Sequence, residues 1–148
     1  MSKVPAIPYE TTLFVRDHCL CLHAQRAARA LARRFDEALR PLELTNGQFS
    51  LLMALNRPEA APMGAVARLL AMDRTTLTAA LKPLERRSLV TSLANPSDAR
   101  SRLLALTTEG EALLAKALPI WQHTHAEVDR LLPEPTSVPI REALRAMS

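Results

Sequence analysis

The clearest periodic pattern of apolar and polar positions runs from Met72 to Arg87. Leu77, Leu81 and Leu84 recur at spacings of four and three, so they form one apolar stripe of an amphipathic helix that must face a core. The residue before this helix is an aspartate, whose carboxylate can accept hydrogen bonds from free backbone N–H groups. The other face carries short hydroxyls and cations without an acidic residue: Arg74, Thr75, Thr78 and Lys82.

The segments on either side of this helix predict its structural context. Upstream, residues 63–71 predict a short helix that ends in a tight turn, and two helices joined in this way form a helix-turn-helix. Downstream, residues 88–93 and 102–107 predict two short strands around a turn-rich loop at 95–99. A β-hairpin directly after the second helix is a wing. The pattern therefore predicts a mainly α fold, a winged helix-turn-helix with a two-stranded wing.

A long helix is predicted ahead of this segment, from about residue 12 to Leu39, before the helix-breaking Pro41. Residues 1–10 hold two prolines and are expected to form a loose arm. The apolar positions of the helix cover a wide arc. They are Leu13, Leu20, Ala24, Ala27, Leu31, Phe35 and Ala38.

Two threonines mark the starts of later helices. Thr45 and the glutamine three residues after it form a capping box, which predicts a helix at about 46–56. The following segment, residues 57–62, is expected to be a connecting loop. Thr107 predicts the start of another long helix, which reaches about Leu132 and which an internal proline at position 119 should bend. A short last helix is expected near residues 138–146.

The helices at both ends of the chain carry more apolar surface than the chain alone can cover. We expect a single domain over residues 1–148, in which about 12–40 and 107–148 form a helical dimerisation scaffold. The winged-helix core occupies about 45–106. Such a scaffold would join two copies of the chain into a two-fold homodimer.

Composition limits the compartment and the partners. The chain has 148 residues, of which only 3% are aromatic, so its core must be built from Leu, Ala and Val. No stretch of about 18 apolar residues and no apolar signal-peptide region occur. We therefore expect a soluble, cytoplasmic protein without a membrane partner. Two cysteines separated by one residue do not make a secreted disulfide framework.

The net charge of +4 becomes informative when it is located along the chain. Residues 68–102 hold seven basic and three acidic residues, and the rest of the chain is balanced. The whole excess therefore lies on the predicted helix-turn-helix and wing, which is the electrostatic footprint of phosphate binding. The same segment has no aromatic side chain, which disfavours an RNA reader because such proteins stack bases on aromatic rings.

Several motifs in this region together resemble one family. Asp-Arg-Thr-Thr at 73–76 is followed by Leu-Glu-Arg-Arg-x-Leu-Val, then Asn-Pro-x-Asp-x-Arg, then Leu-Thr-x-Glu-Gly. In this order they resemble the winged-helix core of the MarR family of bacterial transcription regulators, and the resemblance extends over about residues 12–132. Two positions depart from the family: Ser88 stands where a glycine is usual, and Pro83 removes a backbone donor inside the recognition helix.

The resemblance implies a homodimeric regulator of transcription, most simply a repressor that a small-molecule effector or a thiol modification releases from duplex DNA. The resemblance implies that the recognition helix supplies base and phosphate contacts. A two-fold homodimer would present two such helices about one helical turn of DNA apart, so the expected operator is a near-palindrome. At the wing tip, the resemblance implies that Arg100 enters the minor groove while Asp98 orients it. The candidate DNA-binding residues are Arg74, Thr75, Thr76, Thr78, Lys82, Asp98 and Arg100.

No motif predicts an enzyme or a cofactor. Three glycines at positions 47, 64 and 110 cannot form a dinucleotide or phosphate-binding loop. His125 and Glu127 have the His-x-Glu spacing of zinc deaminases, but the accompanying Pro-Cys-x-x-Cys is missing. A winged-helix protein-interaction module that does not bind DNA remains the alternative function.

Cys19 and Cys21 lie on the predicted first helix. Metal sensing is one alternative, because Cys19 with His23, and His18 with Cys21, have spacings that share a helix face. His123 and His125 offer further donors. The competing interpretation is that both thiols are packed as small hydrophobic side chains. Residues two apart on a helix point to different sides, so a disulfide between the two cysteines is not expected.

Redox sensing is the other hypothesis for these thiols. The place of Cys21 resembles that of the reactive cysteine in the organic-hydroperoxide repressors of the same family. Tyrosines flank the thiol in those proteins, whereas this chain has Gln25 and Phe35 at the equivalent positions. Cys21, and after it Cys19, are thus candidate redox-sensing residues.

Overall fold

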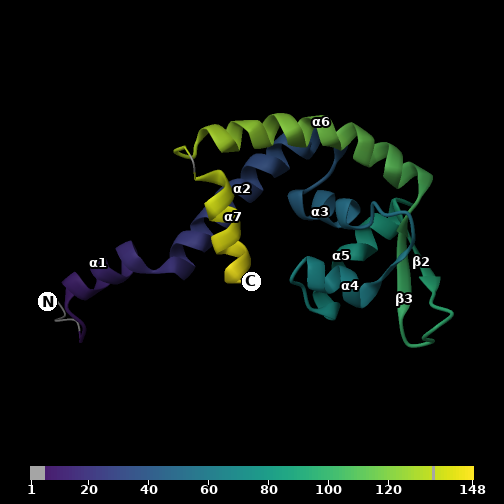
Figure 1. Ribbon diagram of the computed structural model, residues 1–148, viewed down its shortest axis with the longest axis horizontal. Coiled ribbons are helices and arrows are strands. Elements are labelled where there is room, and N and C mark those ends of the chain that lie inside the picture. The colour runs from purple at the N-terminus through teal and green to yellow at the C-terminus, as the bar shows by residue number, and fades with distance from the viewer. Residues whose placement is uncertain (1–5, 135) are drawn as a thin grey trace, which may run out of the picture. The chain divides into compact units, whose positions relative to one another are not determined.

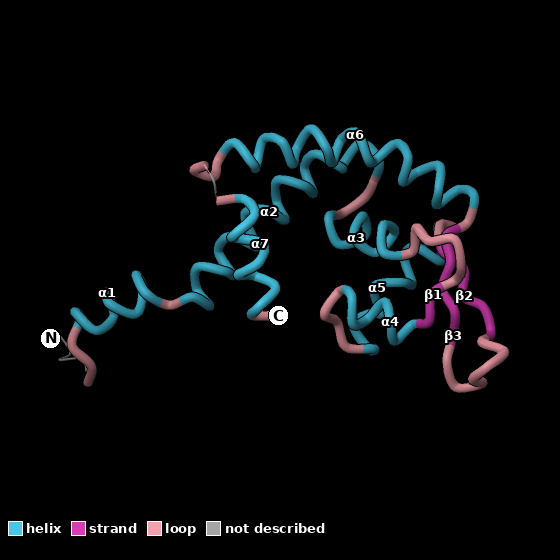
Figure 2. The backbone as a smooth tube through the Cα atoms, viewed as in Figure 1, coloured by secondary structure: helices cyan, strands magenta, loops and turns pink. Residues whose placement is uncertain are grey.

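The computed structural model describes residues 6–134 and 136–148. Figure 1 and Figure 2 show its helices and its small sheet. The chain forms two compact units, one ending at Arg34 and the other running from Phe35 to Ser148. The elements are α1 (Tyr9–His18), α2 (Leu20–Leu39), the 3-10 helix η1 (Arg40–Leu42), α3 (Asn46–Ala54), β1 (Ala61–Pro62), α4 (Met63–Leu69), α5 (Arg74–Arg86), β2 (Val90–Ala94), β3 (Arg102–Leu106), α6 (Thr108–Arg130) and α7 (Ser137–Ala146).

The core of the second unit is built on the apolar stripe of α5. Leu77, Leu81 and Leu84 are at most 2% exposed, as the periodicity predicts. They belong to one cluster with Leu52 of α3 and Leu104 of β3. α3 is apolar around most of its circumference, which is why it lies inside this unit and contacts α6. Within the described residues no helix has the length and hydropathy of a membrane span.

The sheet has three antiparallel strands in the order β1-β3-β2. β2 and β3 form the predicted wing, with Val90 opposite Leu106 and Ala94 opposite Arg102. The prediction of a plain connecting loop at residues 57–62 was wrong at its end. Ala61 is buried and pairs with Leu104, so residues 61–62 form a third strand. Two residues are too short to carry a periodicity of their own, and only the partner strand decides that they are extended.

The predicted caps of α3 and α6 are confirmed. The Thr45 hydroxyl accepts a hydrogen bond from the Gln48 N–H, and the Gln48 side chain accepts one from the Thr45 N–H, which is the complete capping box. The Thr107 hydroxyl accepts from the Gly110 N–H at 3.0 Å. α6 then continues without a break through Pro119 to Arg130, and it is drawn as a curved helix in Figure 1.

In the first unit, the prediction of one uninterrupted long helix was wrong. α1 begins at Tyr9 inside the expected arm, whose residues 1–5 lie outside the described part of the chain. The helix breaks at Cys19, whose ψ of 108° is extended. The Cys19 sulfur then accepts a hydrogen bond from the Leu22 N–H at 3.4 Å, at the start of α2. Because the two cysteines do not share one helix, the argument that placed them on different helix sides no longer applies.

Residues with left-handed backbone end the helical segments on both sides of the recognition helix. Ser88, where a glycine was expected, has φ of 57°, and Ala71 has φ of 52°. After α5, the Ser88 N–H donates to the Glu85 carbonyl and the Leu89 N–H donates to the Leu84 carbonyl, both at 2.9 Å. This pair of bonds is a Schellman motif, so the backbone turns sharply into the wing despite the β-carbon of Ser88.

The base of the wing packs closely against the start of α6. The Thr107 hydroxyl donates to the Ser88 carbonyl at 2.6 Å, and the Thr107 N–H donates to the Leu89 carbonyl at 3.1 Å. A β-carbon at Gly110 would lie only 2.1 Å from the Leu89 oxygen. The residue at position 110 must therefore lack a side chain for α6 to start where it does.

Replacing Gly110 with Ala should lower the free energy of unfolding by about 2–3 kcal/mol, because the neighbour is a backbone atom that cannot rotate away. Gly47→Ala is the matched control. The nearest atom to a β-carbon there is 4.0 Å away, and an alanine in a helix should gain roughly 0.5 kcal/mol. Urea denaturation measures both. Equal stability of the two variants would contradict the close approach at Gly110.

Candidate nucleic-acid interface

The recognition helix α5 presents its polar residues to solvent. Its buried leucines hold the helix on the core, and the five candidate contacts on it are all exposed. The structure therefore brings them together on one exposed surface of a 13-residue helix, long enough to occupy a major groove. These residues are Arg74, Thr75, Thr76, Thr78 and Lys82.

Asp73 caps the N-terminus of this helix. Its carboxylate accepts hydrogen bonds from the Thr76 N–H at 2.7 Å and from the Thr76 hydroxyl at 2.9 Å. The Thr76 backbone N–H is the main cause that lowers the pKa of Asp73, and the Thr76 hydroxyl lowers it further. The carboxylate thus stays ionised at the positive end of the helix dipole, where a negative charge is favourable.

The threonine hydroxyls differ in what they can still offer to a partner. The Thr76 hydroxyl donates its hydrogen to Asp73, and the Thr78 hydroxyl donates to the Arg74 carbonyl at 2.8 Å. Each can still accept a hydrogen bond or present its methyl group. Thr75 has no side-chain hydrogen bond to another described residue, so its hydroxyl can both donate and accept.

The wing tip is ordered by side-chain contacts to its own backbone. The Asn95 side chain accepts from the Ser97 N–H, and the Asp98 carboxylate accepts from the Arg100 N–H, each at 3.0 Å. Asp98 therefore holds the backbone of Arg100 and leaves its guanidinium group exposed. Among the described residues that guanidinium forms no ion pair.

Two cations of the basic segment are engaged within the protein. The Arg87 guanidinium donates to the carbonyls of Leu42 at 3.2 Å and Glu43 at 2.6 Å, tying the end of α5 to η1. The Arg102 guanidinium donates to both the hydroxyl and the carbonyl of Ser92 across the wing. The net charge of residues 68–102 could not distinguish these structural arginines from those whose guanidinium groups have no hydrogen bond or ion pair with a described residue.

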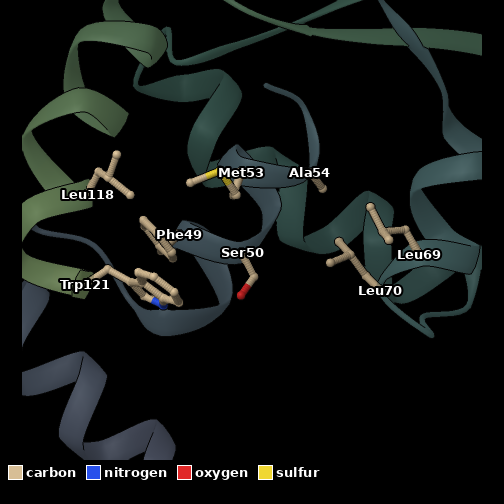
Figure 3. A pocket seen from close by; sticks show the side chains of 8 residues that line it. All are labelled: Phe49, Ser50, Met53, Ala54, Leu69, Leu70, Leu118 and Trp121. Atoms are coloured by element: carbon tan, nitrogen blue, oxygen red, sulfur yellow. The ribbon is translucent and has the colours of Figure 1, made fainter. Parts of the chain in front are cut away.

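An apolar cavity of about 480 Å³ opens between α3, α4 and α6 (Figure 3). A second cavity of about 270 Å³ shares Phe49, Ser50 and Trp121 with it and adds Asn46 and His125. The volume and the apolar lining of the larger cavity lie within the range of small-molecule sites. The sequence did not reveal the cavity, because its residues come from three separate helices. The larger cavity is lined by Phe49, Ser50, Met53, Ala54, Leu69, Leu70, Leu118 and Trp121.

Trp121 joins the apolar cavity to a polar cluster. Its ring stacks near Phe49 at a centroid distance of 6.1 Å and lies 4.8 Å from the ring of His125. His125 in turn lies 3.3 Å from the Asp129 carboxylate, which also pairs with Arg141 of α7 at 3.2 Å. The two cavities thus offer aromatic stacking at one end and ionisable partners at the other.

The histidines next to the cysteines contact backbone oxygens. A ring nitrogen of His23 lies 2.7 Å from the Cys19 carbonyl oxygen, and one of His18 lies 2.8 Å from the Phe14 carbonyl oxygen. The predicted pairing of His18 with Cys21 on one helix face was wrong, because the helix breaks between them. Among the described residues, no three His, Cys, Asp or Glu side chains are grouped so that they could hold a metal ion.

Cys21 is exposed and has a hydrogen-bonded neighbour that the sequence did not predict. The Gln25 amide donates to the Cys21 sulfur at 3.2 Å, and Arg29 donates to the Gln25 oxygen at 3.4 Å. Gln25 thus contacts the thiol although it lacks the phenol of a tyrosine. The i, i+4 spacing of these residues on α2 was the available signal.

Comparison with known proteins identifies related sequences and folds. A sequence profile described as the MarR family matches residues 44–101. The organic hydroperoxide resistance transcriptional regulator of Bacillus subtilis (strain 168) is 31% identical over 101 residues, which are 68% of this chain and 69% of that protein.

Two solved structures resemble the chain over most of its length. The M. tuberculosis transcriptional regulator MosR in complex with DNA is 37% identical, with a TM-score of 0.78, covering 88% of this chain and 95% of that one. The transcriptional repressor CouR bound to a 23-mer DNA duplex is 30% identical, with a TM-score of 0.72, covering 99% and 96%.

The lowered pKa of Asp73 links stability to pH. Because the folded-state pKa lies below the ordinary 3.8, the contribution of the charged cap is present above that value and is lost as the pH falls through the folded pKa. Asp73→Asn keeps a capping oxygen without the charge, so the stability advantage of wild type at pH 7 should shrink below pH 3.8. Urea denaturation over a pH series measures this. A constant difference between the two proteins would rule out the linkage.

Proposed function

This chain belongs to the MarR family of transcription regulators, and we propose that it acts as a homodimeric repressor on a near-palindromic DNA operator in the cytoplasm. It is a DNA-binding regulator rather than an enzyme. The observation that carries the proposal is the exposed outer surface of α5, where threonines and cations gather, beside a wing whose Arg100 guanidinium group forms no ion pair with a described residue.

α5 enters the major groove with its N-terminal half against the bases. Thr75 can donate and accept there, whereas Thr76 and Thr78 contribute acceptor oxygens and methyl groups, because their hydroxyl hydrogens are engaged in the helix. Arg74 contacts bases or phosphates, and Lys82, about two turns later on α5, contacts a phosphate.

The wing reaches the neighbouring minor groove. Asp98 sets the backbone of Arg100, so the guanidinium group can extend from an ordered loop with less loss of conformational freedom. A cation in the minor groove is attracted by the concentrated negative potential there.

Exposed apolar side chains at both ends of the chain support dimerisation. Phe14 on α1 is 62% exposed, and Val138 and Leu144 on α7 are 60% and 49% exposed. Such surfaces are costly to leave in water, and a second copy of the chain would cover them. The dimerisation scaffold at about 12–40 and 107–148 therefore remains part of the proposal.

Two routes could release the repressor from DNA. The cavity beside Trp121 suits a small aromatic effector with an anionic group that faces His125, which lines the adjoining cavity. The exposed Cys21, hydrogen-bonded to Gln25, suits oxidation by an organic hydroperoxide, and the Bacillus subtilis relative is named for resistance to such compounds. Cys19 is half-buried and would be the secondary thiol.

Replacing Arg100 with Ala should weaken operator binding by about 1–3 kcal/mol, as expected for an arginine inserted in a groove. Arg57→Ala, which also removes one exposed positive charge but lies outside the proposed DNA contacts and the dimerisation scaffold, is the control. Titration of labelled duplex DNA at several salt concentrations measures affinity. Sedimentation should show both variants at about twice the 16.3 kDa chain mass. A wild-type affinity insensitive to salt would favour a protein-interaction module instead.

Each release route predicts a different variant that should stay bound to the operator when the releasing compound is added. Cumene hydroperoxide should release wild type but not Cys21→Ser if the thiol is the sensor. The aromatic anion 2-naphthoate should release wild type but not Ser50→Phe if the cavity is the site, because a phenyl group at Ser50 fills it. Operator binding by fluorescence anisotropy measures both. If neither compound releases wild type from the operator, the proposal of DNA binding still stands and both effector proposals are wrong.

A further inference from the structure

The guanidinium groups of two arginines converge over Gly64. A β-carbon at Gly64 would lie 3.7 Å from Nη1 of Arg68 and 3.6 Å from Nη2 of Arg74. Gly64 and Arg68 are on α4, and Arg74 is the first residue of α5. The two cations therefore approach each other across the turn of the helix-turn-helix, although they come from different helices.

This approach places like charges together without a compensating acid. The two nitrogens are at most about 7 Å apart, since each lies close to the same point over Gly64. Neither side chain has an ion pair or a hydrogen bond with another described residue, and both are exposed. The nearby Asp73 carboxylate is occupied by Thr76.

An anion between the guanidinium groups would relieve their repulsion. One phosphate can bridge them through two of its oxygens, with charge-assisted hydrogen bonds of about 2.8 Å each. Arginine is the side chain best suited to such contacts, because its planar fork matches the phosphate oxygens. A side chain larger than a methyl group at position 64 would enter the same space, so the glycine keeps it open.

We propose that Arg68 and Arg74 clamp a single phosphate of the DNA backbone at the mouth of the groove that α5 enters. The inference rests on the proposed function, and it assigns Arg74 to the backbone rather than to a base. Arg68, which belongs to none of the sequence motifs, then contacts the same phosphate as Arg74. The clamp orients the start of α5 on the duplex without reading sequence.

The test compares Arg68→Ala, Arg74→Ala and the double variant on the operator and on a scrambled duplex of equal length. Each single change should weaken binding to both duplexes by a similar factor, roughly tenfold, and lower the salt slope by about two, one for each subunit of the dimer. Because one phosphate is shared within each subunit, the double variant should also lose only about two from the slope. Loss on the operator alone would make Arg74 a base reader, and a slope loss of about four in the double variant would mean separate phosphates. Either result overturns the clamp.

Substitutions at Gly64 provide an independent test in the same dimer. The carboxylate of Gly64→Glu would pair with both guanidinium groups and replace the phosphate. DNA affinity should then fall at least as far as in Arg68→Ala, while the melting temperature is retained. Gly64→Ala should bind like wild type, because its β-carbon makes only ordinary contacts. Full affinity of a folded Gly64→Glu variant would refute the clamp.

Arg57→Ala removes one exposed positive charge outside the proposed DNA contacts and the dimerisation scaffold, and it should leave the salt slope unchanged. Failure of the wild-type protein to bind any duplex would contradict the proposed function itself. If wild type binds DNA and Arg68→Ala binds it with the same affinity and salt slope, only the clamp is contradicted. The two failures are therefore distinguishable.

Discussion

The close approach of Gly110 to the Leu89 carbonyl is the constraint on which the DNA-binding unit depends. The end of α5, the base of the wing and the start of α6 meet at this point, and Thr107 bonds to the Ser88 and Leu89 carbonyls beside it. Apart from the short Thr107 hydroxyl, the atoms that meet here belong to the backbone. The recognition helix and the wing are therefore held in one relative arrangement, which a DNA groove and its neighbour require.

Burial on one side of α5 decides which residues are available on the other. The leucine stripe of α5 lies in the core and leaves its threonines and cations outside. Internal hydrogen bonds then divide the cations further: Arg87 and Arg102 stabilise the fold, whereas Arg68, Arg74 and Arg100 keep free guanidinium groups. The positive charge that can reach DNA is thus concentrated at the helix-turn-helix and at the wing tip.

The cavity and the proposed clamp share the short helix α4. Leu69 and Leu70 line the cavity, and the preceding residue is Arg68. A ligand that separates α4 from α3 or α6 would therefore move an arginine of the proposed clamp. Small shifts matter in a packed unit of this kind, because its side chains cannot deform continuously. This geometry offers a direct physical route from an effector to operator release.

The sequence by itself determined the features whose signals are local. The spacing of Leu77, Leu81 and Leu84, the capping box at Thr45 and the Asp73 cap each act within one or two helical turns, so the helix-turn-helix and its exposed face could be predicted. Tertiary structure alone decided the strand at residues 61–62, the cavity beside Trp121 and the convergence of arginines on Gly64. Each of these depends on residues far apart in the chain or on separate helices, and no periodicity or cap encodes which distant backbone will lie beside them.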